Sequence, residues 1–450
     1  MMRLIRTGIL LAVLLAVVLV TPVSQAEPLQ ECHKVTNTAN ITTQSNKSQV
    51  KVWHVETAND AVTEEINGLA DAWAEEIGPE LKAAGNSGKK NSRLDVEIRY
   101  SRTGLHWMSF MVQARTTYHR KLTGQRFTTR TYHMETGERL MLSDLFDDDE
   151  GIWTLIAERV RQTLTDYWPE VEPDAETLNK LCEKDALEQA DFTLHGMSLV
   201  LHYPAELLYP DHYTLMEVTF FYPEIRESMT EEAMTETNNL AYYKTCALTF
   251  DDGPSASNTP KVLDSLMETG ARATFFVIGN LIKNNRYLVQ REHDNGHAVA
   301  SHNWHHGNVN KSTGAALRRM PQKVNTSMIN AIGIPVRYDR VPGGRYPRMI
   351  EVKVGWAYIQ WSLDTYDWRG ISTTKVLNKV KKKIHDGDII LCHDIKDNTP
   401  ESARQIARFL EEEGYMLLTI DELFAKDGVE LKPNKVYFRC DQGDTSIRKD

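Results

Sequence analysis

Cysteine is scarce in this chain, with five residues among 450 and none spaced as the Cys-x-x-Cys pair of a metal knuckle. An odd number leaves at least one thiol unpaired in a monomer, so cysteine does not define the fold or the function. Positive charge is also in deficit, because 62 acidic residues outnumber 52 basic ones and the formal net charge is −10. Nucleic acid is therefore not an expected partner.

Long apolar runs are missing too, except at the start. Residues 8–20 are continuously apolar, follow two arginines, and precede Ser24 and Ala26, the small residues that a signal peptidase reads. This run is short for a membrane span. We expect a signal peptide, residues 1–26, and a protein that is secreted or held in the cell envelope without a membrane span after cleavage. The alternative is an uncleaved N-terminal anchor.

What remains is ordinary globular composition, 41% hydrophobic and 25% charged, over a length that suggests two or three domains. Residues 27–47 are rich in Thr, Asn and Ser, residues 226–240 are polar and acidic, and both are predicted to be linkers. Between them, residues 48–225 mix helical and alternating apolar patterns, which predicts an α+β domain. This domain contains no cluster of residues typical of catalysis.

After the second linker, strands alternate with helices, and AYIQWSL, residues 357–363, is predicted as one of the strands. Residues 241–430 are predicted to form a second domain, followed by a C-terminal tail, residues 431–450. Repeated β-α units favour a mostly parallel sheet, closed as a barrel or open. Ligands bind beyond the carboxyl ends of the strands in both forms, so the residues at those ends are the candidate site.

Five segments next to predicted strand ends carry acids, imidazoles or a guanidinium. They are Asp251–Asp252, His302–His306, Arg340–Gly344, Asp364–Trp368 and His393–Asp394. Each segment alone has an ordinary structural interpretation, such as a turn, a pair of surface histidines or a helix cap. Five of them at matching strand ends favour a single site. Because every candidate lies beyond Phe250, we expect residues 31 to about 239 to be dispensable for the chemistry but to affect binding of the polymer.

These residue types fit metal-assisted hydrolysis. Two imidazoles and one carboxylate are a common zinc set that leaves a position open for water, whose pKa falls toward neutrality. A further carboxylate can take a proton from that water, and a histidine can protonate the leaving group.

Five short motifs carry a resemblance to a known family. They are TFDDGP, HNWHH, RVPGG, DTYDW and LCH, in that order. With them, residues 242–423 resemble the polysaccharide deacetylase family, also called carbohydrate esterase family 4 or the NodB homology domain. The resemblance implies an α/β fold class: a distorted (β/α) barrel deacetylase domain, preceded here by a smaller α+β accessory domain. It also implies removal of acetyl groups from N-acetylated sugars.

The resemblance further implies roles for matching residues. Asp251 would be the general base with Arg340 as its ion-pair partner, and His393 would be the general acid, paired with Asp367. Zn²⁺, or another divalent cation such as Co²⁺, would be held by three residues: Asp252, His302 and His306. Gly343 would help to stabilise the oxyanion through its backbone N–H, and Trp368 and Leu391 would help to wall the acetyl pocket.

Two positions depart from the family's pattern. Asn303 stands where Ser or Thr usually follows the first histidine, which is a mild polar change. Gly343 stands where an aromatic residue is usual, so its N–H is kept but the ring that shapes the sugar site is lost. This second departure bears on substrate specificity more than on the reaction. Tyr346 and Trp304 are candidates for a replacement surface, and His305 for a substrate contact.

The first half carries a weaker resemblance, through YHMETGERLMLSDLF and EVTFFYPEI, to an accessory domain that precedes deacetylase domains in some bacterial cell-wall enzymes. This resemblance favours peptidoglycan as the substrate. The expected function is an exported metal-dependent hydrolase that removes N-acetyl groups from the amino sugars of an envelope polysaccharide. The alternatives are a chitin or poly-N-acetylglucosamine deacetylase, a xylan O-acetyl esterase, and a non-catalytic glycan-binding protein on the same fold.

Overall fold

The structure, a computed structural model, describes residues 30–43, 48–86, 92–147 and 150–440. The predicted signal peptide, residues 1–26, lies outside these ranges. Within them, no helix combines the length and the apolar composition needed to cross a bilayer.

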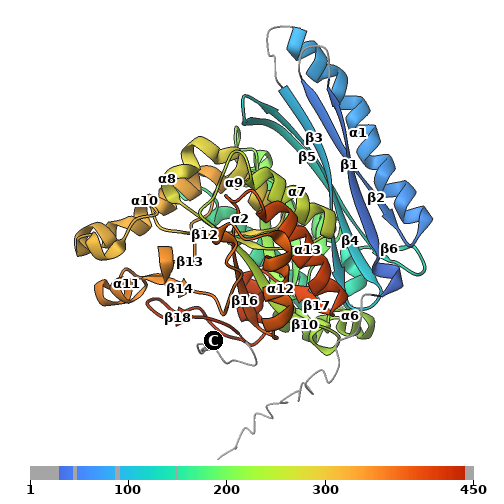
Figure 1. Cartoon of the computed structure of the whole chain (residues 1–450). Helices are drawn as coiled ribbons and strands as arrows, with labels where there is room; N and C mark the ends of the chain where they lie inside the picture. The colour runs from blue at the N-terminus through green and yellow to red at the C-terminus, as the bar shows by residue number, and fades with distance from the viewer. Residues whose placement is uncertain (1–29, 44–47, 87–91, 148–149, 441–450) are drawn as a thin grey trace, which may run out of the picture.

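A six-stranded sheet forms the first part of the chain, with its strands in sequence order. The strands are β1 (Val35–Thr43), β2 (Gln49–Thr57), β3 (Ser92–Thr103), β4 (Trp107–Tyr118), β5 (Lys121–His133) and β6 (Glu138–Leu140). The helix α1 (Asp60–Asn86) connects β2 to β3, which pair in parallel. Its apolar residues Val62, Ile66 and Ala70 recur at helical spacing and are buried against the sheet. Figure 1 shows α1 on the face of the sheet turned away from the rest of the molecule.

A smaller antiparallel sheet follows, with the order β7-β8-β9. Its strands are β7 (Phe192–Leu194), β8 (Ser198–Pro204) and β9 (Leu215–Phe221). The helices around it are α2 (Glu150–Asp166), α3 (Ala175–Leu181), α4 (Lys184–Glu188) and α5 (Tyr222–Ile225). The α+β character expected for the first half is confirmed.

The first predicted linker is wrong, because residues 35–43 form β1. This strand pairs antiparallel with β2 from Val35 opposite Thr57 to Thr43 opposite Gln49. Its Thr-rich composition suits a strand, since β-branched side chains are favoured there. Buried Asn37 also donates hydrogen bonds to the carbonyls of Ile98 (2.8 Å) and Met267 (3.1 Å).

The second predicted linker is wrong as well, because it folds and is partly buried. It contains α6 (Glu231–Glu236), which begins after Thr230, whose hydroxyl accepts the N–H of Ala233. The acidic residues of this segment stabilise local structure. Two of them lie in the first turn of α6, where negative charge is favourable. Glu236 accepts the backbone N–H of both Leu105 and His106.

The last part of the chain is a nine-stranded sheet with the order β15-β16-β10-β11-β12-β13-β14-β18, with β17 beside β10, and its strand pairs are parallel. The strands are β10 (Lys244–Asp251), β11 (Thr274–Val277), β12 (Ala298–Ser301), β13 (Tyr338–Asp339), β14 (Ala357–Ile359), β15 (Leu363–Asp364), β16 (Asp388–His393), β17 (Tyr415–Leu417) and β18 (Val436–Tyr437). The distorted α/β barrel is thus confirmed.

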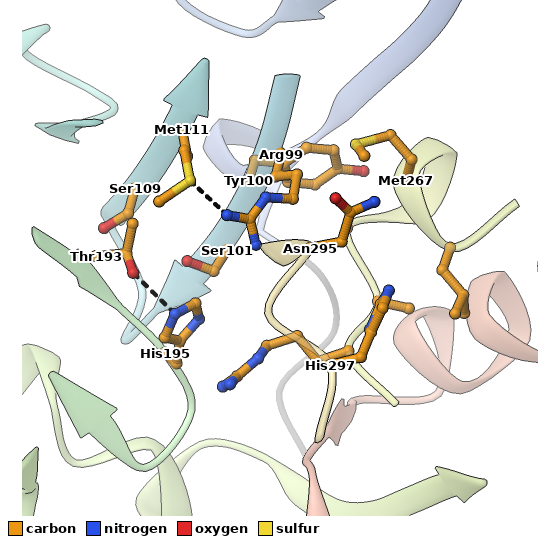
Figure 2. Close-up of a pocket in the computed structure, with 14 residues that line it drawn as sticks. Arg99, Tyr100, Ser101, Ser109, Met111, Thr193, His195, Met267, Asn295 and His297 are labelled. Carbon is orange, nitrogen blue, oxygen red and sulfur yellow. Dashed lines mark hydrogen bonds between the residues drawn. The ribbon is translucent and has the colours of Figure 1, made fainter. Parts of the chain in front are cut away.

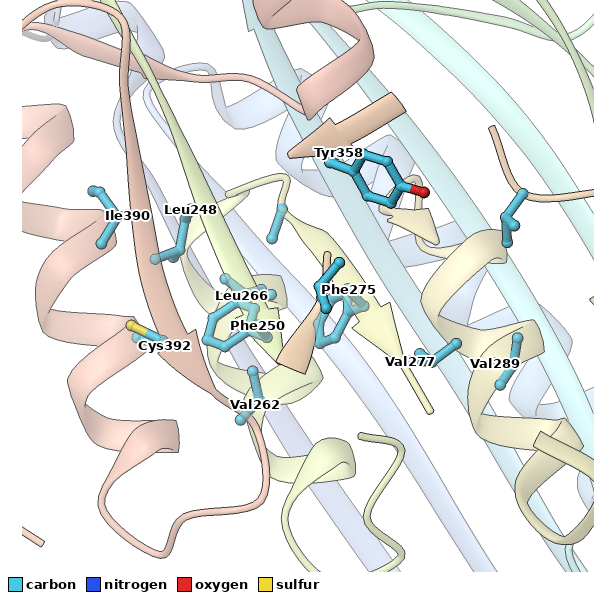
Figure 3. Close-up of a cluster of buried hydrophobic side chains, with 14 of the residues drawn as sticks. Leu248, Phe250, Val262, Leu266, Phe275, Val277, Val289, Tyr358, Ile390 and Cys392 are labelled. Atoms are coloured by element: carbon cyan, nitrogen blue, oxygen red, sulfur yellow. The ribbon is translucent and has the colours of Figure 1, made fainter. Parts of the chain in front are cut away.

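Helices cover this sheet (Figure 1). They are α7 (Thr259–Thr269), α8 (Gly279–Ile282), α9 (Arg286–Asp294), α10 (Gly314–Ile332), α11 (Pro347–Val352), α12 (Thr373–Lys383), α13 (Thr399–Glu412) and α14 (Ile420–Ala425). Figure 3 shows the core between sheet and helices, where Leu248 and Phe250 of β10 lie near Leu266 of α7 and Ile390 of β16. Burial of these side chains fixes β10 at the centre, with the candidate site at its end.

The segment AYIQWSL, predicted as one strand, is two. The strands β14 and β15 lie near opposite ends of the strand order, and residues 360–362 cross between them. The reason is a change of partner: Gln360 donates its N–H to Tyr437, whereas Ser362 donates to Ile389. The first partner lies in β18, so the described part of the predicted C-terminal tail belongs to the sheet.

Charged side chains, most of them buried, connect the six-stranded sheet to α7 and α9. Lys51 Nζ lies 2.6 Å from one oxygen of Asp264, and Arg291 Nη2 lies 2.6 Å from the other. Arg291 also pairs with the fully buried Glu97 (2.6 Å), which pairs in turn with Arg115. Burial opposes ionisation of Glu97, but the two guanidinium groups and Lys51 lower its pKa below the usual value. The two halves of the chain therefore share a buried ionic network.

Candidate metal and catalytic site

The predicted site residues meet at the carboxyl ends of the parallel strands. Asp251 is the last residue of β10 and pairs in register with His393, the last residue of β16. His302 directly follows β12, and Arg340 directly follows β13. Parallel strands align their carboxyl ends at one edge, which is why segments far apart in sequence converge here.

Three side chains form a candidate metal set. Asp252 Oδ1 lies 3.3 Å from His302 Nε2 and 3.2 Å from His306 Nε2, and the three ligand atoms all lie within 4.8 Å of one another. Asp252 Oδ1 is buried without a hydrogen-bond partner. A buried carboxylate oxygen that faces two imidazole nitrogens is a fitting donor set for a divalent cation.

The orientation of His302 suits a ligand. Its Nδ1–H donates to the backbone carbonyl of Arg340 at 2.7 Å, because a carbonyl can only accept, and this leaves the lone pair on Nε2 facing Asp252. Burial opposes ionisation of Asp252, but the neighbouring imidazoles of His302, His393 and His306 favour the charged carboxylate and lower its pKa to about 2. The carboxylate is thus ionised at neutral pH.

Asp251 is held on one side and open on the other. Arg340 Nη1 donates to Asp251 Oδ1 at 2.8 Å, and both side chains are buried. Three further donors of Arg340 are held by Thr249 Oγ1 (2.7 Å) and by the carbonyls of Ile359 and Gln360 (3.0 Å each). Asp251 Oδ2 is left 3.8 Å from His302 Nε2, on the side of the candidate metal set.

His393 is held by a buried carboxylate. Its Nδ1 lies 2.8 Å from Asp367 Oδ1, and Asp367 Oδ2 accepts the N–H of His393 (2.7 Å) and the hydroxyl of Thr399 (3.1 Å). Burial lowers the pKa of His393, but the hydrogen bond and negative charge of Asp367, with Asp251 and Asp252, outweigh burial and raise it. The raised pKa keeps the proton on His393 up to a higher pH than on an ordinary imidazole.

Supporting residues that the sequence did not single out hold this arrangement. Buried Asp339 accepts the hydroxyl of Ser301 (2.6 Å) and the N–H of Asn303 (3.0 Å), which positions the start of the His302–His306 segment. Asn303 has a φ of 63°, in the left-handed region that Asn tolerates better than most residues. A short polar residue directly after a predicted ligand is the signal that points to such a turn.

The predicted pocket residues lie around the same rim. Leu391 is buried in β16, two positions before His393 and on the same face of the strand. Trp368 follows Asp367 and is 45% exposed, so its ring is open to a ligand. Gly343 has a φ of 63°, and a side chain there would run into the guanidinium of Arg345. A cation thus occupies the space beside Gly343 where the sequence resemblance leads one to expect a ring.

Comparison with known proteins gives this arrangement a family. A family model described as polysaccharide deacetylase matches residues 241–355. A peptidoglycan-N-acetylglucosamine deacetylase of Bacillus cereus is 31% identical over 188 residues, which cover 40% of this chain and 88% of that protein. The chain belongs to the polysaccharide deacetylase family. The resemblance inferred from the five motifs is thereby confirmed.

Other members of the polysaccharide deacetylase family are also similar. The peptidoglycan-N-acetylglucosamine deacetylase PgdA of Listeria monocytogenes is 38% identical over 195 residues, or 43% of this chain and 41% of that protein. A bifunctional xylanase/deacetylase of Pseudobutyrivibrio xylanivorans is 35% identical over 203 residues, or 44% of this chain and 33% of that protein. This chain therefore spans well under half of the length of these two relatives.

Proposed function

We propose that this chain is an exported, metal-dependent deacetylase that removes N-acetyl groups from the amino sugars of a cell-wall polysaccharide, peptidoglycan above all. One observation carries the proposal. A possible metal set, a carboxylate held by Arg340 and a histidine held by Asp367 share one rim of the sheet. Together they provide a metal-binding site, a base and an acid for hydrolysis.

The metal would be Zn²⁺ or another divalent cation such as Co²⁺, held by Asp252 Oδ1 and the Nε2 atoms of His302 and His306. Bound there, it supplies Lewis acidity that polarises a carbonyl group and lowers the pKa of water. Two nitrogens and one carboxylate oxygen suit such a cation.

Asp251 is the proposed base. Its Oδ2 accepts a proton as the oxygen of water forms a bond to the acetamide carbon, while Arg340 keeps the carboxylate ionised and fixes its direction. The N–H of Gly343 is the proposed donor to the carbonyl oxygen as negative charge develops on it.

His393 is the proposed acid. Asp367 holds the Nδ1–H, so the proton on Nε2 is available to the sugar nitrogen as the carbon–nitrogen bond breaks. The products are acetate and a free amino sugar. Leu391 and Trp368 are the proposed walls for the acetyl group.

Positive charge at the rim supports an anionic polymer as substrate. The guanidinium of Arg369 lies 4.6 Å from the rings of both Tyr366 and Trp368, and Lys379 lies 4.2 Å from the ring of Tyr366. In the described part of the chain, no carboxylate pairs with Arg369, Lys379 or Arg345. Peptidoglycan carries carboxylates on its stem peptides, and on muramic acid where the peptide is absent, whereas chitin and the xylan backbone are neutral. Relatives named as peptidoglycan deacetylases support the same choice.

The decisive test is mass spectrometry after incubation of the purified protein with muropeptides, chitooligosaccharides and acetylated xylan. We expect loss of N-acetyl groups from muropeptides, with acetate released in equal amount. Loss from xylan alone would identify an O-acetyl esterase instead. Binding to glycans without acetate release would identify the non-catalytic alternative.

Export is proposed from residues 1–26 and has its own test. The mature protein should begin at Glu27 and be recovered from the envelope or the medium. An intact N-terminus on protein that stays with the membrane would support the anchor instead.

A further inference from the structure

A small cavity lies where the six-stranded sheet meets the deacetylase part of the chain. Its volume is about 30 Å³, and polar groups from both parts line it: Arg99, Ser101, Ser109, Thr193, His195 and Asn295. Figure 2 shows Arg99 extending from β3 into this group, with His195 and His297 also around it. Most of the lining side chains are buried, so the cavity belongs to the interior.

Arg99 has almost no partner in this place. The guanidinium of Arg99 has five N–H donors. Among the described residues, the hydrogen bond that it makes goes to the sulfur of Met111, which is a weak acceptor. Arg99 Nε is buried without a hydrogen bond, and no carboxylate of the described residues lies within ion-pair distance. Burial lowers the pKa of Arg99 to about 10, which leaves it charged at neutral pH. The carboxylates of Glu217, Asp294 and Glu97 act on Arg99 only from beyond ion-pair distance. A buried guanidinium without a direct ion-pair partner is costly and needs an explanation.

The other lining groups do not neutralise it. Arg272 is already paired, with Nη1 2.8 Å from Glu422 and Nε donating to the carbonyl of Gly296 at 2.7 Å. Burial lowers the pKa of His195 and His297 well below the usual value, so both rings are neutral. His297 Nδ1 accepts the N–H of Ala273, which leaves a donor rather than an acceptor on Nε2. No carboxylate is among the lining residues.

We propose that this cavity binds one small monovalent anion, of the size of chloride, against the guanidinium of Arg99. Arg99 Nε and Asn295 Nδ2 are buried beside this space without a hydrogen-bond partner among the described residues. Arg99 also lacks a directly bound counter-charge, which water does not supply. The volume exceeds that needed for one water molecule but excludes large organic anions. Because the lining comes from β3, β4 and β7 and from the loops after α7 and α9, the anion would strengthen the junction of the two halves.

The test compares thermal unfolding of the full mature protein in chloride and in gluconate at equal ionic strength. We expect Tm in chloride to be higher by about 2 °C or more, since a ligand bound only by the folded state raises stability. In Arg99→Met the two anions should give the same Tm. Arg126→Met, which removes an exposed guanidinium paired with Glu76, should keep the chloride effect.

Crystals grown in bromide provide a second measurement that does not depend on a variant. An anomalous peak beside the Arg99 guanidinium supports the proposal even if Arg99→Met does not fold. A cavity that holds only water, with no such peak, overturns it. A chloride effect that persists unchanged in Arg99→Met overturns it as well, because the effect then arises elsewhere.

Discussion

At the scale of single residues, the adjacent carboxylates Asp251 and Asp252 have different surroundings. Asp251 lies in a strand and is bound by Arg340, whereas Asp252 has a φ of 78° and turns toward His302 and His306. Consecutive side chains at a strand end diverge, so the repulsion between them is offset by separate partners.

This difference predicts unequal effects of two substitutions. Asp251→Asn should keep the metal and lose turnover by about 10²–10⁴-fold, as for loss of a general base. Asp252→Asn should lose the metal, with part of the activity restored by excess cation. Elemental analysis and acetate release measure both. Metal loss in Asp251→Asn with retention in Asp252→Asn would reverse the two roles.

The pairing of His393 with Asp367 predicts a shift in pH dependence. The negative charge of Asp367 raises the pKa of His393, so Asp367→Asn should lower that pKa and let burial dominate. The imidazole then loses its proton at lower pH, and the alkaline limb of kcat/KM should move to lower pH. Glu351→Gln, at an exposed pair with Arg348, is the control. An alkaline limb unchanged in Asp367→Asn would mean that another group is the acid.

The rim cation Arg369 predicts a change in specificity rather than in chemistry. Arg369→Gln should raise KM for carboxylate-bearing muropeptides by about 5-fold or more, the loss of roughly one favourable charge contact. KM for neutral chitooligosaccharides and kcat for both should change little. Arg348→Gln, whose guanidinium pairs with Glu351, is the matched control. Equal changes for charged and neutral substrates would argue against recognition of an anionic polymer.

At the scale of elements, Arg340 joins strands from both sides of the barrel. Its guanidinium contacts Thr249 of β10, the end of β14 and the crossing segment after it, in addition to Asp251. The strands β10 and β14, which are not neighbours in the sheet, are thereby connected through one side chain. The orientation of Asp251, the proposed base, and the connection between β10 and β14 therefore depend on the same side chain.

This arrangement predicts a cost for Thr249→Val, which has nearly the same shape. The hydroxyl accepts from Arg340 and donates to the carbonyl of Ile390 at 2.6 Å. Its loss leaves buried polar groups unsatisfied, and we expect unfolding in urea to show a loss of about 1–3 kcal/mol. Thr154→Val on the exposed face of α2 should change stability by no more than about 0.5 kcal/mol. Equal stability of both variants would show that Arg340 is held without Thr249.

At the scale of the whole molecule, the two halves are joined by the ionic network around Glu97 and by apolar contacts such as Met267 of α7 with the sheet core. The first half therefore packs against the deacetylase part of the chain through buried contacts. Sequence analysis suggested that it is dispensable for the chemistry, since it supplies no candidate catalytic residue. Its buried contacts indicate a structural requirement instead.

A shortened chain that begins at Asn239 tests this requirement. It would expose Asp264, Arg291 and Met267, and we expect it to lack cooperative unfolding and near-ultraviolet circular dichroism of the intact protein. The full mature chain is the control. A shortened chain that unfolds cooperatively and deacetylates a soluble oligosaccharide at the full rate would contradict the expectation.

The family and the fold class were open to prediction because their signals are local. A parallel sheet brings strand ends together whatever connects them, so Asp251, His302, Arg340 and His393 could be assigned to one site from their places after predicted strands. The predictions of two linkers and of a single strand over AYIQWSL were wrong for the opposite reason. Strands and helices of a few residues are stabilised by partners elsewhere in the chain, and composition does not reveal those partners.

The sequence by itself thus determined the family, the parallel sheet and the grouping of residues at its edge. The tertiary structure alone decided what surrounds the polar face of β3. Alternation of polar and apolar residues there predicts one face open to water, yet Glu97 is buried and Arg99 faces an internal cavity, because α7 and α9 cover that face. The charge of Glu97 is read from the chain, but one of its two counter-charges is Arg291, 194 positions away, and only the folded chain brings the two together.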